Sequence, residues 1–501
     1  MRNLKVAAAV AAALASAGAG AANTDVYISG ASAQKNFWYA DLVNIANCVG
    51  GAGGVTGNKW AGPATAPFTK SPDFSYVQCT AGAAPLNPLI TAGSTVTFHY
   101  SAELGSIWGI ANALGSVVSA VQYPATHLFL ANAGTCAPVP YVIANASYTG
   151  GGGANCGSGA GKYDLYTTNG TDSIIGGNPA YIVSHVPDID VSDLEPAKFQ
   201  FPDNWSTANN GGAGVPPLYT ALNTAEGPPT AADLAKITPP AKGTFVNGEV
   251  FAVIANFVGT TVTDPHNLSS ASLAAILQGD YAKWSQVPEV GTAGDSTGTP
   301  IILVRRDHGS GSQVAASITF TGQECGAIND SGIQQENGTS VILAGSTSAM
   351  RTIVNANAGS IGYLSLTGNV PNLNETDNYV LESVDGAQPN AHNSAAGYYK
   401  FATQTWAFSP PGANGVAATL ITRAQTATAL AAVLGNETVA KGADNRFSTA
   451  AGAEIGAYAL PGIITGQNAS TGNVNTLTNI PVALRNYGGE SCTVAAGQNG
   501  T

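Results

Sequence analysis

The sequence predicts an α/β fold, because a strand, a turn of small residues and a helix follow one another three times along the chain. Each apolar strand leads into a turn that contains glycine and serine, and a helix-compatible segment comes next. The three units are residues 25–29 with helix 36–45, residues 95–100 with helix 107–118, and residues 301–303 with helix 313–320. The chain has 501 residues, of which 44% are hydrophobic, which is enough for two or more lobes.

Other segments extend this pattern. We predict strands at 181–184 and 249–255, a turn into a strand at 359–364, and a glycine-rich loop at 50–57. Helices are predicted at 269–277, 346–355 and 424–433, the first capped by Ser269 or Ser270. In open α/β sheets, ligands bind outside the carboxyl ends of the strands, so the turns are the places to look for function.

The charge balance excludes some classes of partner. Only 10% of the residues are charged and the formal net charge is −12. Nucleic acids and anionic membranes are bound by clustered lysine and arginine, so neither is an expected partner. A small anion remains compatible, because nearby N–H groups and one arginine outweigh distant, solvent-screened charge.

The N-terminus predicts export. Residues 1–22 combine basic Arg2 and Lys5, an apolar segment and small residues around Ala21, as in a cleaved signal peptide. No cysteine lies near the cleavage site, so we expect a periplasmic or secreted protein without a lipid anchor or membrane span.

The six cysteines then favour three disulfides, because an exported protein folds in an oxidising compartment. Many pairings are open, and pairing neighbours gives Cys48–Cys79, Cys136–Cys156 and Cys325–Cys492.

The most informative stretch is residues 304–312, Val-Arg-Arg-Asp-His-Gly-Ser-Gly-Ser, which follows an apolar strand. Backbone N–H groups, hydroxyls and a guanidinium at a helix start can hold an oxyanion. Glycine lets the backbone approach a ligand closely. A flexible turn beside surface arginines is the alternative, since Gly-Ser turns are common.

Several segments, in this order, resemble the phosphate-binding protein of bacterial phosphate ABC importers, a type II periplasmic binding protein. The similar segments are Gly30-Ala31-Ser32-Ala33, residues 100–109 with Gly105-Ser106, residues 188–193, residues 279–284 with Lys283-Trp284, residues 305–312, and residues 359–364. The Arg-Arg loop and Lys-Trp are fairly specific, and the other turns are weak alone. Together they cover residues 25–370, with long insertions between Ile110 and Tyr181.

This resemblance implies a two-lobed α/β fold with a hinge and a ligand cleft, plus disulfide-stapled insertions. It divides the chain into a signal peptide (1–22), lobe 1 (23–250, with an insertion at about 111–180), lobe 2 (251–366), and a return to lobe 1 with a C-terminal extension (367–501). It also implies a solute-binding protein and not an enzyme. The protein would hand an oxyanion, most simply phosphate, to an ABC permease or scavenge it outside the cell.

The ligand-binding residues that the resemblance implies are Ser32, Ala33, Ser106, Asp193, Arg306, Ser310, Gly311 and Ser312. Hydroxyls and N–H groups would donate to the anion, and Arg306 would pair with its charge. Asp193 would accept a hydrogen bond from a protonated anion oxygen and so reject sulfate. The chain departs from the family at His308, where an acid is expected, and at Ala33, where an aromatic is expected. Another oxyanion or a phosphorylated small molecule therefore stays open.

Other interpretations of these residues remain. Asp193 could cap a helix at 194–199, and Ser106 could be a helix N-cap. A secreted hydrolase using Ser360 or Ser296 is one alternative function. An adhesive protein on a binding-protein scaffold is the other. The histidines lack metal-ligand spacing, so we expect no metal and no cofactor.

Overall fold

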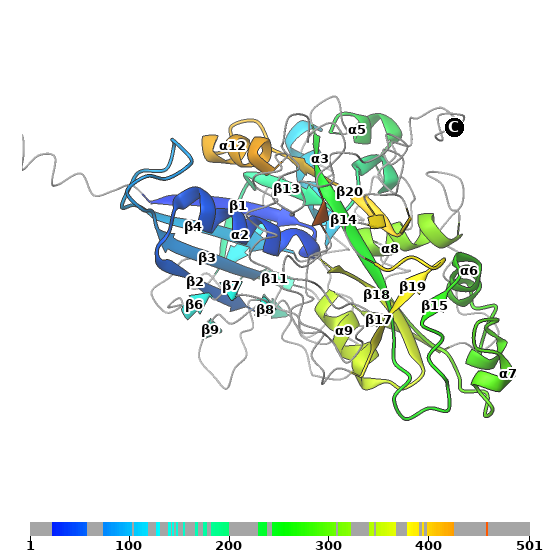
Figure 1. Cartoon of the computed structure of the whole chain (residues 1–501). Coiled ribbons are helices and arrows are strands. Elements are labelled where there is room, and N and C mark those ends of the chain that lie inside the picture. Colours follow the sequence, from blue (N-terminus) through cyan, green and yellow to red (C-terminus); the bar gives the residue numbers. More distant parts are fainter. Residues whose placement is uncertain are drawn as a thin grey trace, which may run out of the picture.

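The computed structural model contains a large mixed sheet, which runs through the described part of the chain (Figure 1). The description covers residues 23–57, 74–102, 105–118, 127–130, 139–141, 143–144, 147–148, 154–155, 166–168, 174–177, 182–199, 229–237, 243–306, 309–321, 340–344, 347–366, 378–389, 393–394, 398–424 and 457–458. Within these ranges, none of the helices has the length and apolarity that crossing a bilayer requires.

The strands are mostly short and apolar. They are β1 (Thr24–Gly30), β2 (Val49–Gly57), β3 (Phe74–Thr80), β4 (Thr95–Ser101), β5 (His127–Leu130), β6 (Val139–Tyr141), β7 (Ile143–Ala144), β8 (Ser147–Tyr148), β9 (Ala154–Asn155), β10 (Tyr166–Thr168), β11 (Ile174–Gly177), β12 (Ile182–His185), β13 (Ile189–Ser192), β14 (Thr244–Ala255), β15 (Asn267–Leu268), β16 (Ile302–Arg306), β17 (Ser340–Ala344), β18 (Ser360–Ser365), β19 (Val380–Val384), β20 (Ala402–Phe408) and β21 (Ala457–Tyr458).

The helices include several single turns. They are η1 (Ser32–Gln34), α2 (Lys35–Ala46), α3 (Ser106–Val117), η2 (Pro196–Phe199), α5 (Ala231–Ala235), α6 (Ser270–Gln278), η4 (Trp284–Gln286), α7 (Gly291–Gly294), α8 (Gly311–Ala316), the π-helical turn η5 (Ser317–Thr321), α9 (Thr347–Ala356) and α12 (Gly415–Ala424).

The long strand β14 connects two halves of the sheet. Its residues 244–250 pair with β20, and its residues 251–255 pair with β18. On the β20 side the order is β20-β13-β1-β4-β3-β2-β6, which we call the first half. On the β18 side the order is β18-β16-β17, which with the end of β14 we call the second half. The predicted α/β class is confirmed, and β14 is the strand that connects the halves (Figure 1).

Parallel pairing places the predicted turns at common edges. In the first half, β1 is parallel to both β4 and β13. In the second half, β16 is parallel to β17 and β18. The segments that follow β1, β4 and β13 therefore leave the first sheet at one edge, and the loop after β16 leaves the second sheet at its corresponding edge.

Close backbone packing fixes α3 on the first half. Gly109 of α3 faces Gly30 and the carbonyl of Val191, and a Cβ on Gly109 would lie 2.4 Å from that oxygen. Gly30, at φ +123°, has no room for a side chain either, with the same oxygen 1.9 Å from its ideal Cβ. These two glycines let the helix lie directly on β1 and β13, which sets the position of Ser106 one turn earlier.

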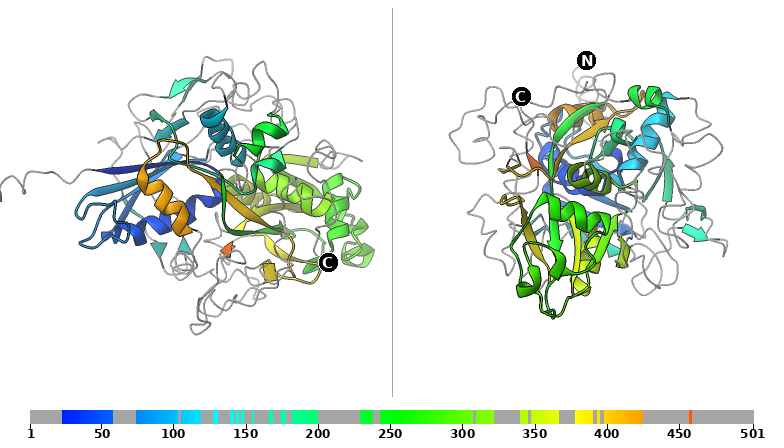
Figure 2. Two further views of the ribbon diagram at one scale, coloured as in Figure 1. Left: turned by 90° about the horizontal axis from the view of Figure 1, so that it is seen from above. Right: turned by 90° about the vertical axis from the view of Figure 1, so that its right-hand side faces the viewer.

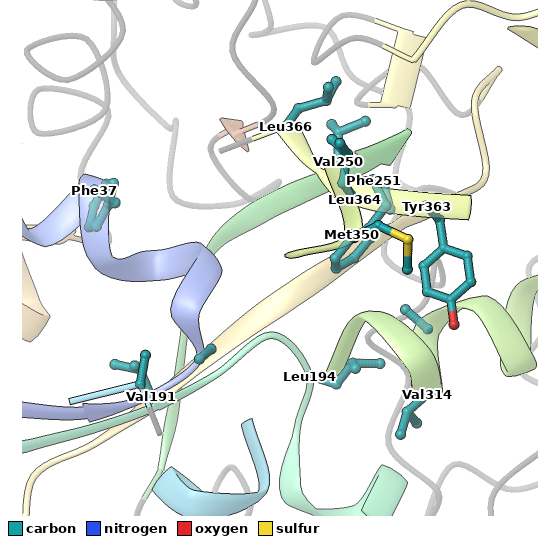
Figure 3. Close-up of a cluster of buried hydrophobic side chains, with 14 of the residues drawn as sticks. Phe37, Val191, Leu194, Val250, Phe251, Val314, Met350, Tyr363, Leu364 and Leu366 are labelled. Atoms are coloured by element: carbon teal, nitrogen blue, oxygen red, sulfur yellow. The ribbon is translucent and has the colours of Figure 1, made fainter. Parts of the chain in front are cut away.

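The apolar core is continuous across β14. It includes Phe37 and Val191 from the first half and Met350 and Leu364 from the second. Figure 3 shows these buried side chains, with Val250 and Phe251 of β14 beside Met350 and Leu364. Helix α12 lies against the first half (Figure 2). Just before the helix, the backbone N–H of Asn414 donates to the Asp188 carboxylate at 2.8 Å.

Two sequence predictions need correction, and a third can be compared at one residue only. Residues 50–57 were expected as a loop, but Val49–Gly57 form strand β2, because β3 offers it a full hydrogen-bonding edge. The helix expected at 313–320 begins at Gly311 and changes to a π-helical turn at Ser317. Of the helix expected at 424–433, only Ala424 is described, as the last residue of α12, and 425–433 lie outside the described residues.

One predicted disulfide is confirmed. Cys48 and Cys79 are bonded, with their Cα atoms 5.6 Å apart, and join the end of α2 to β3. Cys136, Cys156, Cys325 and Cys492 lie outside the described residues, as do the predicted signal peptide and the C-terminal extension. The division of the chain into lobes stays a prediction.

Candidate functional site

The candidate site lies where the loop after β16 meets the first half. Two contacts define this meeting. The Ile107 N–H of α3 donates to the Gly309 carbonyl at 3.1 Å. Gly311 lies so close to Ser106 and Asp193 that an ideal Cβ on it would be 2.4 Å from Ser106 Oγ and 2.7 Å from Asp193 Oδ2. Three residues predicted from three distant parts of the sequence, Ser106, Asp193 and Gly311, thus lie at one place.

Ser106 and Asp193 hold each other. The Asp193 N–H donates to Ser106 Oγ at 3.1 Å, and the nearby Ser106 hydroxyl has a lowering effect on the pKa of the Asp193 carboxyl. Ser106 is the first residue of α3, behind Gly105 as N-cap, so its hydroxyl is not the cap of that helix. Asp193 does not cap a helix at 194–199 either, since η2 begins only at Pro196. Thr403 of β20 donates to the Asp193 carbonyl at 2.8 Å and fixes the backbone.

The Asp193 carboxyl is buried and retains one free acceptor. Burial raises its pKa to about 6, against the lowering effects of the Ser106 hydroxyl and the Arg306 charge. Among the described residues, its Oδ1 has no hydrogen-bond partner. The buried Oγ of Ser312, next to Gly311, also has none within that part of the chain. Leaving such groups without a partner costs about 1–3 kcal/mol each.

Arg306 supplies the positive charge. It is the last residue of β16 and only 3% exposed. Its Nε donates to the Ala344 carbonyl at 2.9 Å, and Nη1 lies 3.4 Å from the Thr347 hydroxyl. The Nη2 end of the guanidinium lies close to Gly105 of the first half. An ideal Cβ built on Gly105 would be 3.9 Å from Nη2. The Ala344 carbonyl of β17 and the Thr347 hydroxyl of α9 therefore orient a desolvated guanidinium toward the meeting point.

A second series of hydrogen bonds, through Tyr363 of β18, holds the loop between β16 and α8 in place. The Arg306 N–H donates to the Tyr363 hydroxyl at 3.2 Å, and that hydroxyl donates to Gln313 of α8. Figure 3 shows the hydroxyl end of Tyr363 directed toward α8, with Leu194 and Val314 in the same apolar cluster. Because all these groups are buried, the positions of Ser310 and Ser312 are set by packing as well as by hydrogen bonds.

The remaining predicted site residues lie farther from the contact between Gly311, Ser106 and Asp193. Ser310, the N-cap of α8, is 1% exposed and its Cα lies 3.9 Å from an ideal Cβ on Gly105. Ser32 is half-buried on η1, at the same sheet edge as Asp193, but the contact that η1 makes with the site goes through Gln34. Nothing is described of the Ala33 side chain, and Asp307 and His308 lie outside the described residues.

Sequence reasoning missed Glu249. This acid of β14 is fully buried and receives hydrogen bonds from Gln34 Nε2, at 2.7 Å, and from the Ser365 hydroxyl. Burial, and then the charge of Asp193, raise the pKa of Glu249 well above its usual range. A single acid at the start of the apolar run Val-Phe-Ala-Val-Ile-Ala is an unusual burial, and that pattern was the signal available in the sequence.

The alternative nucleophile Ser360 is committed elsewhere. Its hydroxyl donates to the Asn357 carbonyl at 2.6 Å and lies 3.1 Å from the Val354 carbonyl, and the residue is fully buried. Its role is to hold the end of α9 against β18. Within the described residues, no group of three histidine, cysteine or acidic side chains is arranged to hold a metal ion.

Comparison with known proteins agrees with the motif analysis. Residues 237–435 match the family model of the PBP superfamily domain, a range that contains Glu249, Arg306 and the 309–312 loop. No curated protein matches the chain.

Among solved structures, the chain resembles a protein from Clostridium perfringens described as a phosphate ABC transporter substrate-binding protein with bound phosphate. The identity is 11%, over 83% of this chain and 98% of that one, with a TM-score of 0.41. An ABC-type phosphate transport receptor from Vibrio cholerae is 19% identical over 39% of this chain and 70% of its own, with a TM-score of 0.28. PstS from Borrelia burgdorferi is 14% identical over 50% and 78%, with a TM-score of 0.29.

At these TM-scores the similarity to each structure is weak. The family match bears out the resemblance inferred from the motifs, and it covers residues 237–435 of this chain.

Proposed function

We propose that the chain is a solute-binding protein that captures an inorganic oxyanion, most simply phosphate, between the two halves of its sheet. The observation that carries the proposal is the set of buried groups around Gly311. Arg306 supplies one positive charge, Ser312 supplies a hydroxyl without a partner among the described residues, and Asp193 supplies a free carboxylate oxygen. An oxyanion bearing a proton satisfies all three at once.

Asp193 makes the site selective for protonated anions. With a pKa of about 6, its carboxyl is mostly ionised at neutral pH and can only accept hydrogen bonds. Monohydrogen phosphate and arsenate offer an O–H to it, whereas sulfate offers none. Sulfate would leave a buried carboxylate facing an anion, which we expect to weaken its binding by about tenfold or more.

Export and uptake are parts of the same proposal. The Cys48–Cys79 disulfide supports an oxidising compartment. We propose that the mature chain acts in the periplasm or outside the cell, delivering its anion to an ABC permease or retaining it as a scavenger. N-terminal sequencing of the exported chain tests this, and we expect its first residue to follow Ala21 or Ala22.

Calorimetric titration with phosphate, arsenate and sulfate tests the ligand assignment. We expect saturable binding of phosphate and arsenate, weaker binding of sulfate, and loss of phosphate binding in Arg306→Ala. Arg306→Lys keeps the charge but not the fork of donors, and should retain only part of the affinity. Arg423→Ala, on α12, is the matched control and should bind as the wild type does. Phosphate binding that persists in Arg306→Ala would overturn the proposal.

A further inference from the structure

His127, the first residue of β5, is a buried histidine outside the candidate site that bonds both helix α3 and strand β1. The residue is only 2% exposed. Its Nε2 receives the indole N–H of Trp108 in α3, and its Nδ1 lies 3.1 Å from Ser29 Oγ in β1. The rings of His127 and Trp108 also meet edge to face, with their centroids 4.6 Å apart. One side chain of β5 therefore contacts a helix and a strand at once.

The partners of His127 determine where its ring proton lies. An indole N–H can only donate, so Nε2 is the unprotonated nitrogen and accepts from Trp108. The proton is then on Nδ1, which donates to Ser29 Oγ. Burial lowers the pKa of His127 to about 3, so the ring stays neutral at neutral pH. The same Ser29 oxygen receives the Asn112 side-chain amide at 2.9 Å, which adds a second bond from α3.

These hydrogen bonds fix α3 in a direction that its packing leaves free. Gly109 and Gly30 let the helix lie close to the sheet, but two glycines present no side chains that oppose sliding along it. Trp108 and Asn112 are four residues apart, so they share one face of the helix. Both are buried, and hydrogen bonds depend on direction as well as distance. Their bonds therefore set how far α3 extends toward the candidate site.

The first turn of α3 carries two contacts of that site. Ser106 Oγ accepts the Asp193 N–H at 3.1 Å. The Ile107 N–H donates to the Gly309 carbonyl at 3.1 Å, and Trp108 is the next residue along the chain. Because a helix moves as a rigid rod over one turn, a slide of about 1 Å would lengthen both contacts beyond hydrogen-bonding range.

Strand β5 is held on the sheet by bonds that do not involve His127. His99 of β4 donates through Nδ1 to the Leu130 carbonyl at 2.8 Å. On the paired strand β12, the ring of His185 stacks on that of Tyr27, with centroids 3.9 Å apart. These contacts give His127 a fixed position, and they remain when its ring is replaced.

We propose that His127 is a positioning residue of the anion site, which holds α3 through Trp108 and thereby places the first turn of α3 against the 309–312 loop. The effect on affinity rests on the proposed function, whereas the effect on the position of α3 does not. Strand β5 lies within the segment of about 111–180 that the sequence resemblance predicts as an insertion. The added segment therefore takes part in shaping the site.

Amide hydrogen exchange in the ligand-free full chain tests the positioning without any anion. His127→Phe keeps a ring but offers no acceptor to Trp108, so the Ile107 amide should exchange about fivefold faster or more, the equivalent of one hydrogen bond. Trp108→Phe removes the donor and should have the same effect. Exchange in α6, far along the chain, should not change. His185→Phe is the matched control, since His185 lies directly opposite His127 in the β5–β12 ladder, and it should exchange as the wild type does.

Calorimetric titration with phosphate is the second arm. We expect affinity to fall by about fivefold or more in His127→Phe and in Trp108→Phe. The double variant should lose no more than the larger single loss, because both changes break the same bond. His127→Gln has a side-chain oxygen that can accept the indole N–H, and it should keep most of the affinity. His185→Phe should bind as the wild type does.

The inference is overturned if His127→Phe keeps wild-type exchange at Ile107 or wild-type phosphate affinity. Single losses that add in the double variant, or exchange in α6 that rises as much as at Ile107, would also overturn it. If the wild type itself binds no phosphate, the proposed function fails, and exchange at Ile107 alone decides whether His127 positions α3. Should His127→Phe not fold, Trp108→Phe and His127→Gln decide both arms.

Discussion

Replacing Gly311 with alanine tests the contact between the two halves. The new methyl group would lie 2.4 Å from Ser106 Oγ, 2.6 Å from Asp193 Cβ and 2.7 Å from Asp193 Oδ2. Non-bonded carbon contacts settle at about 3.5–4.0 Å, so the loop must retreat by about 1 Å. Ser106 and Asp193 cannot yield, since both are buried and bonded to each other.

The displacement of the loop in Gly311→Ala determines how much phosphate affinity is lost. Overpacking of this kind costs about 1–3 kcal/mol, against a gain of up to about 1 kcal/mol from alanine at a helix start. If the anion is held by both halves, a loss of about 1–3 kcal/mol lowers phosphate affinity by about 5- to 150-fold. The backbone conformation of Gly311 is not left-handed, so the effect is steric and not conformational.

Calorimetry of phosphate binding, with thermal unfolding alongside, is the assay for Gly311→Ala. The matched control is Gly415→Ala, at the first turn of α12. Its methyl group would meet only the end of the exposed Leu89 side chain, at 3.2 Å. We expect the control to bind as the wild type does. An affinity for Gly311→Ala within about twofold of the wild type would refute the close contact as part of the bound state.

Further predictions concern neighbouring groups. Asp193→Asn should bind sulfate better relative to phosphate, because the amide donates where the carboxylate only accepts; competition calorimetry measures the ratio, and an unchanged ratio contradicts the role. Because the pKa of Asp193 is raised to about 6, folding takes up a proton between about pH 4 and about pH 6. As pH rises through that window, the free energy of unfolding should fall by about 3 kcal/mol more in the wild type than in Asp193→Asn. Denaturation measurements that give the same pH dependence for both proteins would contradict this. Ser312→Ala should weaken phosphate binding by about 1 kcal/mol without lowering the melting temperature, since its hydroxyl has no partner among the described residues; a destabilised variant would show that the hydroxyl serves the fold. Replacing Cys48 and Cys79 with alanine should destabilise the chain by about 2–4 kcal/mol and leave anion affinity near that of the wild type, as judged by denaturation and calorimetry; a lost affinity would tie the bridge to the site.

Helix α6 shows what the sequence could predict. Its expected N-cap, Ser269, accepts the Ser272 N–H at 3.1 Å, and Gly279 ends it in the left-handed conformation at φ 81°. Leu273 and Ile276 form its buried face. Every signal here is local, because the cap, the periodicity and the glycine lie within a few residues of one another.

Strand β2 shows the opposite case. Its sequence, Val-Gly-Gly-Ala-Gly-Gly-Val-Thr-Gly, has little strand propensity and was expected as a loop. The strand forms because β3 pairs with it along one edge and β6 along the other. Neither partner could be located from the glycine-rich segment itself.

The candidate site also has a part that the sequence predicts and a part that only the fold reveals. The Arg306 loop is visible in the sequence because an apolar strand, an arginine and a Gly-Ser turn are contiguous. The meeting of that loop with Ser106 and Asp193 joins segments more than one hundred residues apart, and only the ordered resemblance to a known family suggested it. Glu249 was missed because its importance depends on Gln34 and Ser365, which the fold brings to it from opposite directions in the chain.

A crystal structure of the full chain grown with phosphate is the most direct test of the central claim. We predict one phosphate in contact with the Arg306 guanidinium, with one oxygen within hydrogen-bond distance of Asp193 Oδ1 and another within reach of Ser312 Oγ. Phosphate bound elsewhere, or a site that stays without anion at saturating phosphate, would contradict the account.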